Sequence, residues 1–323
     1  MRTMQAYLTP ASLCLCPSCV CHWCSSEGDT TVVNAGDWVK IDLAVHIDGY
    51  IAAVAHTVIC PGADGAPAAP ATGKQADVLA AAACARELLP HLVRPGLKNT
   101  AIPGALAAVA EAFGVNVVEG VLMHQMKRFV IDGNQVIAAR QGPEMRAAEF
   151  EFGVNEVYTL DVVFSTGEGK PKMVDEKQTA VYKHALDHKY SLKLKAARAV
   201  LGDIMSRLGM LAFAERAVRV EGLEGGPTRV KLGLVECLKN ELLHSYPVLW
   251  EKSGDAVVHF KSTVLLMPNG PDVVTGNTIP VPPHQSEKAL TDGDLLATLA
   301  QPLRVSKKAA KKAAKAEAQG AAE

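Results

Sequence analysis

The sequence predicts an α+β protein, and three patterns along the chain indicate it. Residues 37–60 alternate apolar and polar side chains around a central Asp-Gly pair, which is typical of a long β-hairpin. Residues 157–164 and 257–266 are short apolar runs rich in valine and aromatic side chains, as buried strands require. Residues 74–93 repeat alanine and leucine at helical spacing until Pro95-Gly96, which ends the helix.

The hairpin carries the clearest local signal. Odd-numbered residues from Val39 to Ile47 are apolar and alternate with mostly polar neighbours. This period of two predicts a strand with one buried face. Asp48-Gly49 is a favoured two-residue turn, because both residues tolerate a positive φ, so Ile47 should pair with Tyr50.

The same register gives the hairpin its functional interest. Asp42 should pair with Ala55, and Ala53 should lie diagonally from Asp42 on the same face, about 7 Å away. A second carboxylate at position 53 would make a two-metal site, but the residue there is alanine. Further along, Asp161 lies inside the predicted buried strand, where an isolated charge is costly and needs a partner.

Size and composition bound the remaining possibilities. The 323 residues suffice for two average domains or one large α/β domain, and 49% of them are hydrophobic, enough for a sizeable core. The net charge is −1, so any attraction to nucleic acid must come from a local patch. We find no convincing secretory signal and no apolar stretch near the roughly 20 residues of a membrane helix, so we expect no membrane insertion.

Residues 1–30 form a cysteine-rich start. They contain five of the eight cysteines, and His22 lies between the last two. The five are Cys14, Cys16, Cys19, Cys21 and Cys24. This spacing could hold zinc, but structural zinc sites pair two such knuckles across a spacer and no second knuckle is present. The pattern favours a strand and loop with reduced thiols in an intracellular setting.

Two basic segments are candidate nucleic-acid contacts. The pattern of residues 175 to about 210 predicts a long helical region. Lysines occur along it densely enough to suggest an RNA contact, although the basic face of a helix usually contacts only solvent. From residue 268 the composition turns to Asn, Gly, Pro and Asp, which predicts that the fold ends near residue 275 and that residues 273–323 are a flexible tail. The tail repeats lysine pairs every four residues, so on a helix they would form a basic stripe. The predicted nucleic-acid-binding residues are Lys183, Lys189, Lys193, Lys195, Arg198, Lys307, Lys308, Lys311, Lys312 and Lys315.

Several stretches resemble the proliferation-associated, ErbB-binding protein family, a relative of the type 2 methionine aminopeptidases. They are residues 39–43 with 55–57, 119–125, 173–179, 233–237 and the specific motif F-K-S-T-V-L-L-M-P-N-G-P at 260–271. The resemblance runs from about residue 10 to 272. It implies the pita-bread (creatinase/aminopeptidase-like) fold over residues 31–272, a curved antiparallel sheet covered by helices, with a helical insertion at about 175–246. It also implies family helices upstream that this sequence does not contain.

The resemblance further implies the remnant of a metal site. The aminopeptidases hold two metal ions with Asp, Asp, His, Glu and Glu, and the matching positions here are Asp42, Ala53, His124, Asp161 and Lys261. Another match, His22, corresponds to a histidine that the aminopeptidases keep near the substrate. Two divalent cations need bridging carboxylates to offset their repulsion, and this set loses two negative charges and gains a positive one. We therefore expect no metal, no cofactor and no enzymatic activity, with the ammonium of Lys261 neutralising Asp42 and Asp161.

By the same resemblance, the expected function is that of an inactive aminopeptidase-like scaffold. It would bind ribosomal or other structured RNA and ribosomal subunits, and act in ribosome biogenesis, translation control and growth regulation. Its expected location is the cytoplasm, nucleus and nucleolus, and signalling or transcription proteins stay open as further partners. The alternatives are a metal-dependent methionine aminopeptidase and a module that grips peptides or proteins without cleaving them.

Overall fold

The computed structural model of the chain describes residues 32–304 except 63–64, 143–146, 177–178, 210, 221–225 and 277. Upstream it describes only the backbone of three short strands, β1 (Ala6–Leu8), β2 (Ser12–Cys14) and β3 (Cys19–Cys21). The zinc alternative, His22 and the five tail lysines lie outside the described residues, so the expectations about them stay predictions.

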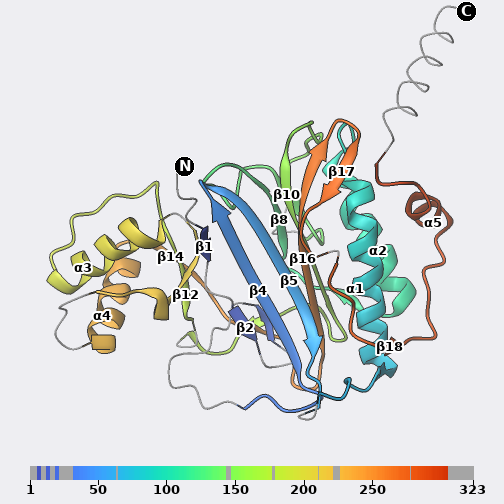
Figure 1. The fold of residues 1–323 in the computed structure, drawn as a ribbon, viewed down its shortest axis with the longest axis horizontal. Helices are drawn as coiled ribbons and strands as arrows, with labels where there is room; N and C mark the ends of the chain where they lie inside the picture. Colours follow the sequence, from blue (N-terminus) through green and yellow to red (C-terminus); the bar gives the residue numbers. More distant parts are fainter. Residues whose placement is uncertain are drawn as a thin grey trace, which may run out of the picture.

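A ten-stranded, antiparallel sheet forms the centre of the molecule. Its main path runs β1, β4, β5, β16, β10, β8, β9, with β2, β7 and β17 added at its margins (Figure 1). The bounds are β4 (Trp38–Ile47), β5 (Tyr50–Ile59), β7 (Asn116–Val117), β8 (Leu122–Met126), β9 (Val136–Ala138), β10 (Val157–Ser165), β16 (Val257–Met267) and β17 (Gly270–Val273). Segments distant in sequence thus become direct neighbours, which is what assembles the site described below.

The predicted hairpin is confirmed in its register. Ile47 pairs with Tyr50 and Asp42 with Ala55, and both turn residues have positive φ, 52° at Asp48 and 85° at Gly49. The predicted single buried face is wrong for β4. Burial there does not alternate, because neighbouring parts of the protein cover portions of both faces of the strand.

Two helices cover one face of the sheet (Figure 1). They are α1 (Gly73–Leu92), close to the predicted 74–93, and α2 (Ile102–Phe113), which a 3-10 turn at Asn99–Ala101 precedes. Their buried side chains, among them Leu79, Leu89 and Leu106, form one core with the even-numbered residues of β10 and with Val258 and Phe260 of β16. The odd-numbered residues of these two strands therefore face the other side.

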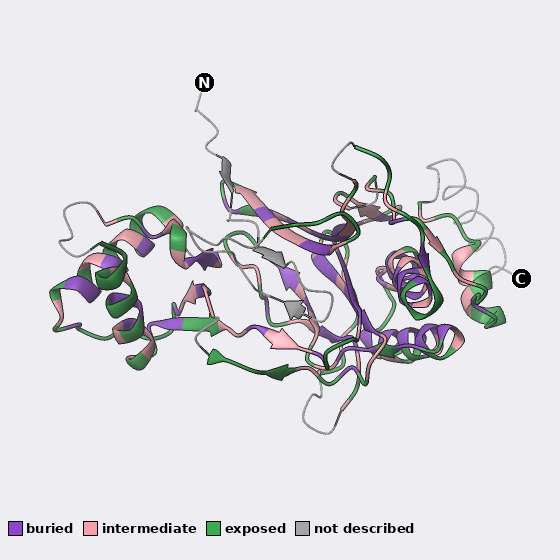
Figure 2. Ribbon diagram, turned by 90° about the horizontal axis from the view of Figure 1, so that it is seen from below, coloured by how far each residue is buried: buried purple, intermediate pink, exposed green. Residues whose placement is uncertain are grey.

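The α3–α4 region lies on that other side and has a core of its own (Figure 1). It contains β12 (Val181–His184), α3 (Lys195–Asp203), a π-helical turn (Ile204–Leu208), β13 (Phe213–Ala214), a 3-10 turn (Glu215–Ala217), α4 (Gly226–Lys239) and β14 (Leu243–Tyr246). The strands pair in the order β13-β12-β14. Many outward-facing residues of α3 and α4 are exposed, whereas the central strands are largely buried (Figure 2).

The prediction of one long helical region over residues 175–210 is wrong. Among the described residues of this stretch, the α-helix and the π-helical turn cover only residues 195–208, and Val181-Tyr182 instead pairs with Tyr246 and Ser245 of β14. β-branched and aromatic side chains favour strand pairing, and the partner strand lies some sixty residues away in sequence. A local pattern cannot reveal such a partner.

The prediction of a flexible tail from residue 273 is wrong for residues up to 304. β18 (His284–Gln285) pairs in parallel with β6 (Ala71–Thr72), and α5 (Gly293–Leu299) packs beside α1. Leu290 is only 9% exposed and belongs to the main core, which Leu295 and Leu299 also contact. The composition of this segment, rich in Pro, Asn and Asp, predicted a loop, because its apolar residues are few and widely spaced.

A third small sheet joins β11 (Lys172–Met173), β15 (Leu249–Trp250) and β3. Among the described residues, no helix combines the length and apolar character needed to cross a membrane.

Candidate functional site

Four residues form one row across the centre of the sheet. Asp42 on β4 pairs with Ala55 on β5, Ala55 with Lys261 on β16, and Lys261 with Asp161 on β10. Neighbouring strands are about 4.8 Å apart, so the row places residues from four distant parts of the sequence within side-chain reach. Strand alternation points Lys261 and Asp161 away from the helix layer.

The ammonium of Lys261 lies between two carboxylates. Its Nζ is 2.7 Å from Asp42 Oδ2 and 3.2 Å from Asp161 Oδ2. To reach Asp42 the lysine must pass over β5, where the small side chains of Ala53 and Ala55 leave room. The other oxygen of Asp161, Oδ1, lies 2.6 Å from Nε2 of His259, so both oxygens of this carboxylate, whose side chain is 15% exposed, have partners.

The electrostatics of the site favour the ionised forms of Lys261 and Asp161. Burial alone would lower the pKa of Lys261, but the carboxylates of Asp161 and Asp42 outweigh it and hold that pKa above its usual range. Burial alone would raise the pKa of Asp161, but Lys261 and His259 outweigh it and hold that pKa below its usual range. Each charge is tolerable inside the protein because the opposite charge is beside it.

This ion-pair cluster lies in the wall of a pocket of about 400 Å³ between the central sheet and the α3–α4 region. Ala53 and His124 line the same pocket, and the His124 ring Nδ1 lies 3.4 Å from the Gly133 carbonyl. The remaining wall is largely apolar and includes Val121, Leu122, Ile131 and Phe213. The cluster therefore faces a cavity large enough for a small ligand or the end of a peptide.

A second ion pair borders the pocket, and it changes the interpretation of Lys183. The Nζ of Lys183 contacts both carboxylate oxygens of Asp132, which lines the pocket, and the lysine side chain is only 14% exposed. Lys183 thus lies at the pocket, paired with Asp132, and not on an exposed basic face; its predicted nucleic-acid contact stays a prediction. Nearby, burial and the charge of Asp132 raise the pKa of Tyr246 to about 12.

The other predicted basic residues of this region lie on its surface. Lys189 and Lys193 are exposed in the loop before α3, and Lys195 is exposed in the first turn of that helix. The Arg198 guanidinium donates to the carbonyls of Leu192 and Lys193, at 3.1 and 2.7 Å, and so fastens the loop to the helix.

Sequence reasoning missed His259 as a member of the site. It is two residues before Lys261 on β16, so strand alternation puts both on the same face. That signal was available in the sequence. The Lys183–Asp132 pair carried no such signal, because the two residues meet only through the tertiary fold.

The residues that could ligate a metal here are Asp42, Asp161, His124 and His259, and they do not form a suitable set. Among the described residues no group of three or more His, Cys, Asp or Glu side chains is arranged to hold a metal ion. Lys261 places a cation between both carboxylates, 2.7 and 3.2 Å from their oxygens, where a bridging metal ion would need to bind them. The donor set thus fits an ammonium group better than a pair of divalent cations.

A large antiparallel sheet with helices on one face and this pocket on the other defines the pita-bread, aminopeptidase-like class of proteins. The family model for metallopeptidase family M24 matches residues 5–184. ErbB-3 binding protein 1 of Solanum tuberosum is 46% identical over 291 residues, covering 90% of this chain and 71% of the relative. Proliferation-associated protein A of Dictyostelium discoideum is 41% identical over 297 residues, covering 92% and 74%.

The chain belongs to metallopeptidase family M24, and within it to the proliferation-associated, ErbB-binding proteins. The predicted family and pita-bread fold are thereby confirmed. A solved structure of a thermophilic Arx1 superposes with a TM-score of 0.83 at 21% identity, over 94% of this chain and 85% of that one. At that identity the likeness speaks for the fold alone. The two close relatives above carry names of binding or proliferation-associated proteins, not of enzymes.

Proposed function

We propose that the protein is a catalytically inactive scaffold on an aminopeptidase fold, which binds structured RNA and ribosomal particles in ribosome biogenesis, translation control and growth regulation. One observation carries the inactive part of the proposal. The Lys261 ammonium lies against both Asp42 and Asp161, the carboxylates that a two-metal peptidase would need for its ions. Replacing those ions with one ammonium removes the Lewis acid and the activated water that peptide hydrolysis requires.

The surface before and along α3 supports the RNA part. Residues 185–200 contain four basic residues and one acid, Asp187, so their net charge is +3. Tyr190 lies between Lys189 and Lys193 and is 48% exposed. Exposed aromatic rings among lysines suit RNA, because bases stack on the rings while lysines contact phosphates.

The family also supports our proposals for partners and location. The Solanum tuberosum relative is named for binding ErbB-3, so a signalling protein is a second class of partner for this chain. The proposed locations are the cytoplasm, nucleus and nucleolus, where ribosomal particles are assembled and used.

A second candidate function uses the pocket itself. Its apolar walls and its volume of about 400 Å³ suit the first residues of a peptide, which the protein would hold without cleaving. Binding of this kind would be insensitive to the lysines of the α3 surface.

Salt dependence of RNA binding discriminates between the two candidates. We would measure the affinity for a structured ribosomal RNA fragment from 50 to 200 mM salt, with the intact chain, with residues 305–323 removed, and with Lys189, Lys193 and Lys195 changed to Gln. If each of the three lysines meets a phosphate, the triple variant should reduce the magnitude of the slope of log affinity against log salt by about 2 to 3.

The matched control changes Lys98, Lys170 and Lys172 to Gln, which alters the net charge equally at exposed positions elsewhere. It should leave the slope unchanged. An affinity that ignores salt, or that both triple variants reduce alike, would contradict a specific RNA surface on the α3 region.

A further inference from the structure

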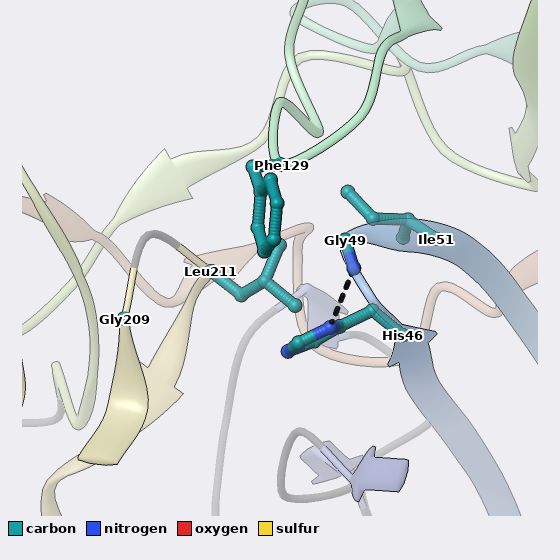
Figure 3. A pocket seen from close by; sticks show the side chains of 6 residues that line it. All are labelled: His46, Gly49, Ile51, Phe129, Gly209 and Leu211. Atoms are coloured by element: carbon teal, nitrogen blue, oxygen red, sulfur yellow. Dashed lines mark hydrogen bonds between the residues drawn. The ribbon is translucent and has the colours of Figure 1, made fainter. Parts of the chain in front are cut away.

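A second pocket lies at the tip of the β4–β5 hairpin, away from the ion-pair cluster. Its volume is about 320 Å³, and it opens between the hairpin turn and the segment that follows the π-helical turn (Figure 3). Its walls are almost entirely apolar and are made by His46, Gly49, Ile51, Phe129, Gly209 and Leu211. Beneath it, Ile51 and Leu211 pack with Met126 in a small buried cluster.

The ring of Phe129 is held in place as one wall of this pocket. Phe129 occupies a tight turn closed by two hydrogen bonds between Lys127 and Val130, with N–O distances of 2.9 and 2.8 Å. Its φ is +62°, a conformation that bulky residues rarely adopt, so the surrounding contacts must maintain it.

Those contacts come from the hairpin turn. The Phe129 amide donates to the Gly49 carbonyl at 2.8 Å, and the ring lies so close that a Cβ at Gly49 would be 2.6 Å from it. The His46 ring meets Phe129 edge-on, with centroids 6.2 Å apart. Figure 3 shows the Leu211 side chain between Phe129 and His46. The aromatic wall is thus fixed before any ligand binds.

The rim of the pocket is aromatic and positively charged. The Arg128 guanidinium lies 5.3 Å from the Phe129 ring and 5.5 Å from the Tyr50 ring, and its Nε donates to the Asp48 carbonyl at 2.8 Å. Tyr50 is 69% exposed and Phe129 41% exposed. In the described part of the chain, neither Lys127 nor Arg128 forms an ion pair. With Asp48 counted against them, the rim keeps a net charge of +1.

We propose that this pocket binds one unpaired base of an RNA chain, with Phe129 as the stacking surface and with Lys127 and Arg128 contacting the flanking phosphates. The inference rests on the proposed RNA binding and names a site for it. Single-stranded bases are recognised by aromatic faces and by arginine planes, and both are present here beside an apolar cavity. An apolar protein side chain could use the cavity but would leave the two rim cations without a counterpart.

The test compares two ten-nucleotide probes, oligoadenylate and an abasic strand with the same sugar–phosphate backbone. The wild-type chain should bind oligoadenylate on the order of tenfold more tightly than the abasic strand. Phe129→Asn removes the ring and tolerates the positive φ, so it should reduce oligoadenylate binding on the order of tenfold and leave the abasic strand unaffected.

Two further variants sharpen the assignment. Phe129→Tyr keeps the ring and should bind as the wild type does, whereas Lys127→Gln should weaken both probes, because both carry phosphates. Thermal unfolding of each variant checks that it folds. NMR shifts of the Ile51 and Leu211 methyl groups on adding oligoadenylate would locate the base directly.

The outcomes separate this inference from the proposed function. If the ribosomal RNA fragment still binds but the wild type does not distinguish the two ten-nucleotide probes, the base pocket is wrong and the RNA-binding scaffold stands. If neither a ribosomal RNA fragment nor oligoadenylate binds, both are wrong. Methyl shifts caused by N-acetyl-leucinamide but not by oligoadenylate would overturn the inference in favour of a docked protein side chain.

Discussion

Lys261→Met is the substitution that most sharply perturbs the ion-pair cluster. Methionine keeps the unbranched, apolar stem and removes the ammonium, which leaves Asp42 and Asp161 facing each other in a site where their side chains are 22% and 15% exposed. At an effective dielectric constant near 20, one attraction at the 2.7 Å separation of Lys261 and Asp42 is about 6 kcal/mol before desolvation. Removing one partner of a buried pair costs about 3–5 kcal/mol, and we expect a loss of unfolding free energy in that range at pH 7.

The pH dependence gives the same substitution a second signature. In the wild type the pKa of Asp161 is held below its unfolded value of about 3.9, so its stabilisation is complete above that pH and is lost as the pH falls through the folded pKa. In Lys261→Met the burial of Asp161 is opposed only by His259, so its pKa rises. If that pKa exceeds the unfolded value, the variant gains stability as the pH falls through it, and the deficit should shrink below about pH 5. The contribution of Lys261 itself, whose pKa is raised, should persist up to about pH 10.5 and be lost above it.

Chemical denaturation of the wild type, Lys261→Met and two control variants between pH 3 and pH 9 measures this. The first control, Lys98→Met, removes a surface pair with Glu149 and should leave stability unchanged at every pH. The second control adds Asp42→Asn and Asp161→Asn to Lys261→Met, which removes the unpaired charges and should recover most of the loss. A Lys261→Met unfolding free energy less than about 1 kcal/mol below that of the wild type at pH 7 would refute the reasoning. So would a difference in unfolding free energy that does not change with pH.

Two other predictions concern the hairpin turn and the C-terminal segment. Gly36→Ala and Gly49→Ala place a side chain at nearly the same φ, 86° and 85°, but only at Gly49 would the new Cβ meet the Phe129 ring. Urea unfolding should therefore show Gly49→Ala to be the less stable by about 1 kcal/mol or more, and equal losses would contradict the described packing of Phe129. Leu290→Ala should cost about 2–5 kcal/mol because Leu290 is 9% exposed, whereas Leu296→Ala at 45% exposure should stay within about 0.5 kcal/mol. Similar small losses of unfolding free energy for both substitutions would indicate that residues 273–304 are a flexible tail after all.

The sequence anticipated those parts of the fold whose signals are local. The turn at Asp48-Gly49 set the register of the hairpin, and with it the pairing of Asp42 with Ala55. The helix now called α1 and the strand now called β16 also carry their patterns within one continuous stretch.

The errors arose where the partner is distant. The sequence around Val181-Tyr182 predicts a helix, but in the fold these residues pair with β14. Leu290 lies in a stretch predicted to be a tail, but it packs into the core beside α1. In the site, the relation of Asp42 to Lys261 came from the family resemblance, not from local pattern. His259 was readable from strand alternation, whereas the Lys183–Asp132 pair and the Phe129 pocket exist only in the folded chain.

We propose above that Lys261 has taken the place of the catalytic metals. Release of methionine from the peptide Met-Ala-Ser, measured with cobalt or manganese in excess, tests this most directly. We predict no release above the blank at either metal, because the ammonium already occupies both carboxylates. Methionine release that requires metal and that Asp42→Asn abolishes would contradict the account.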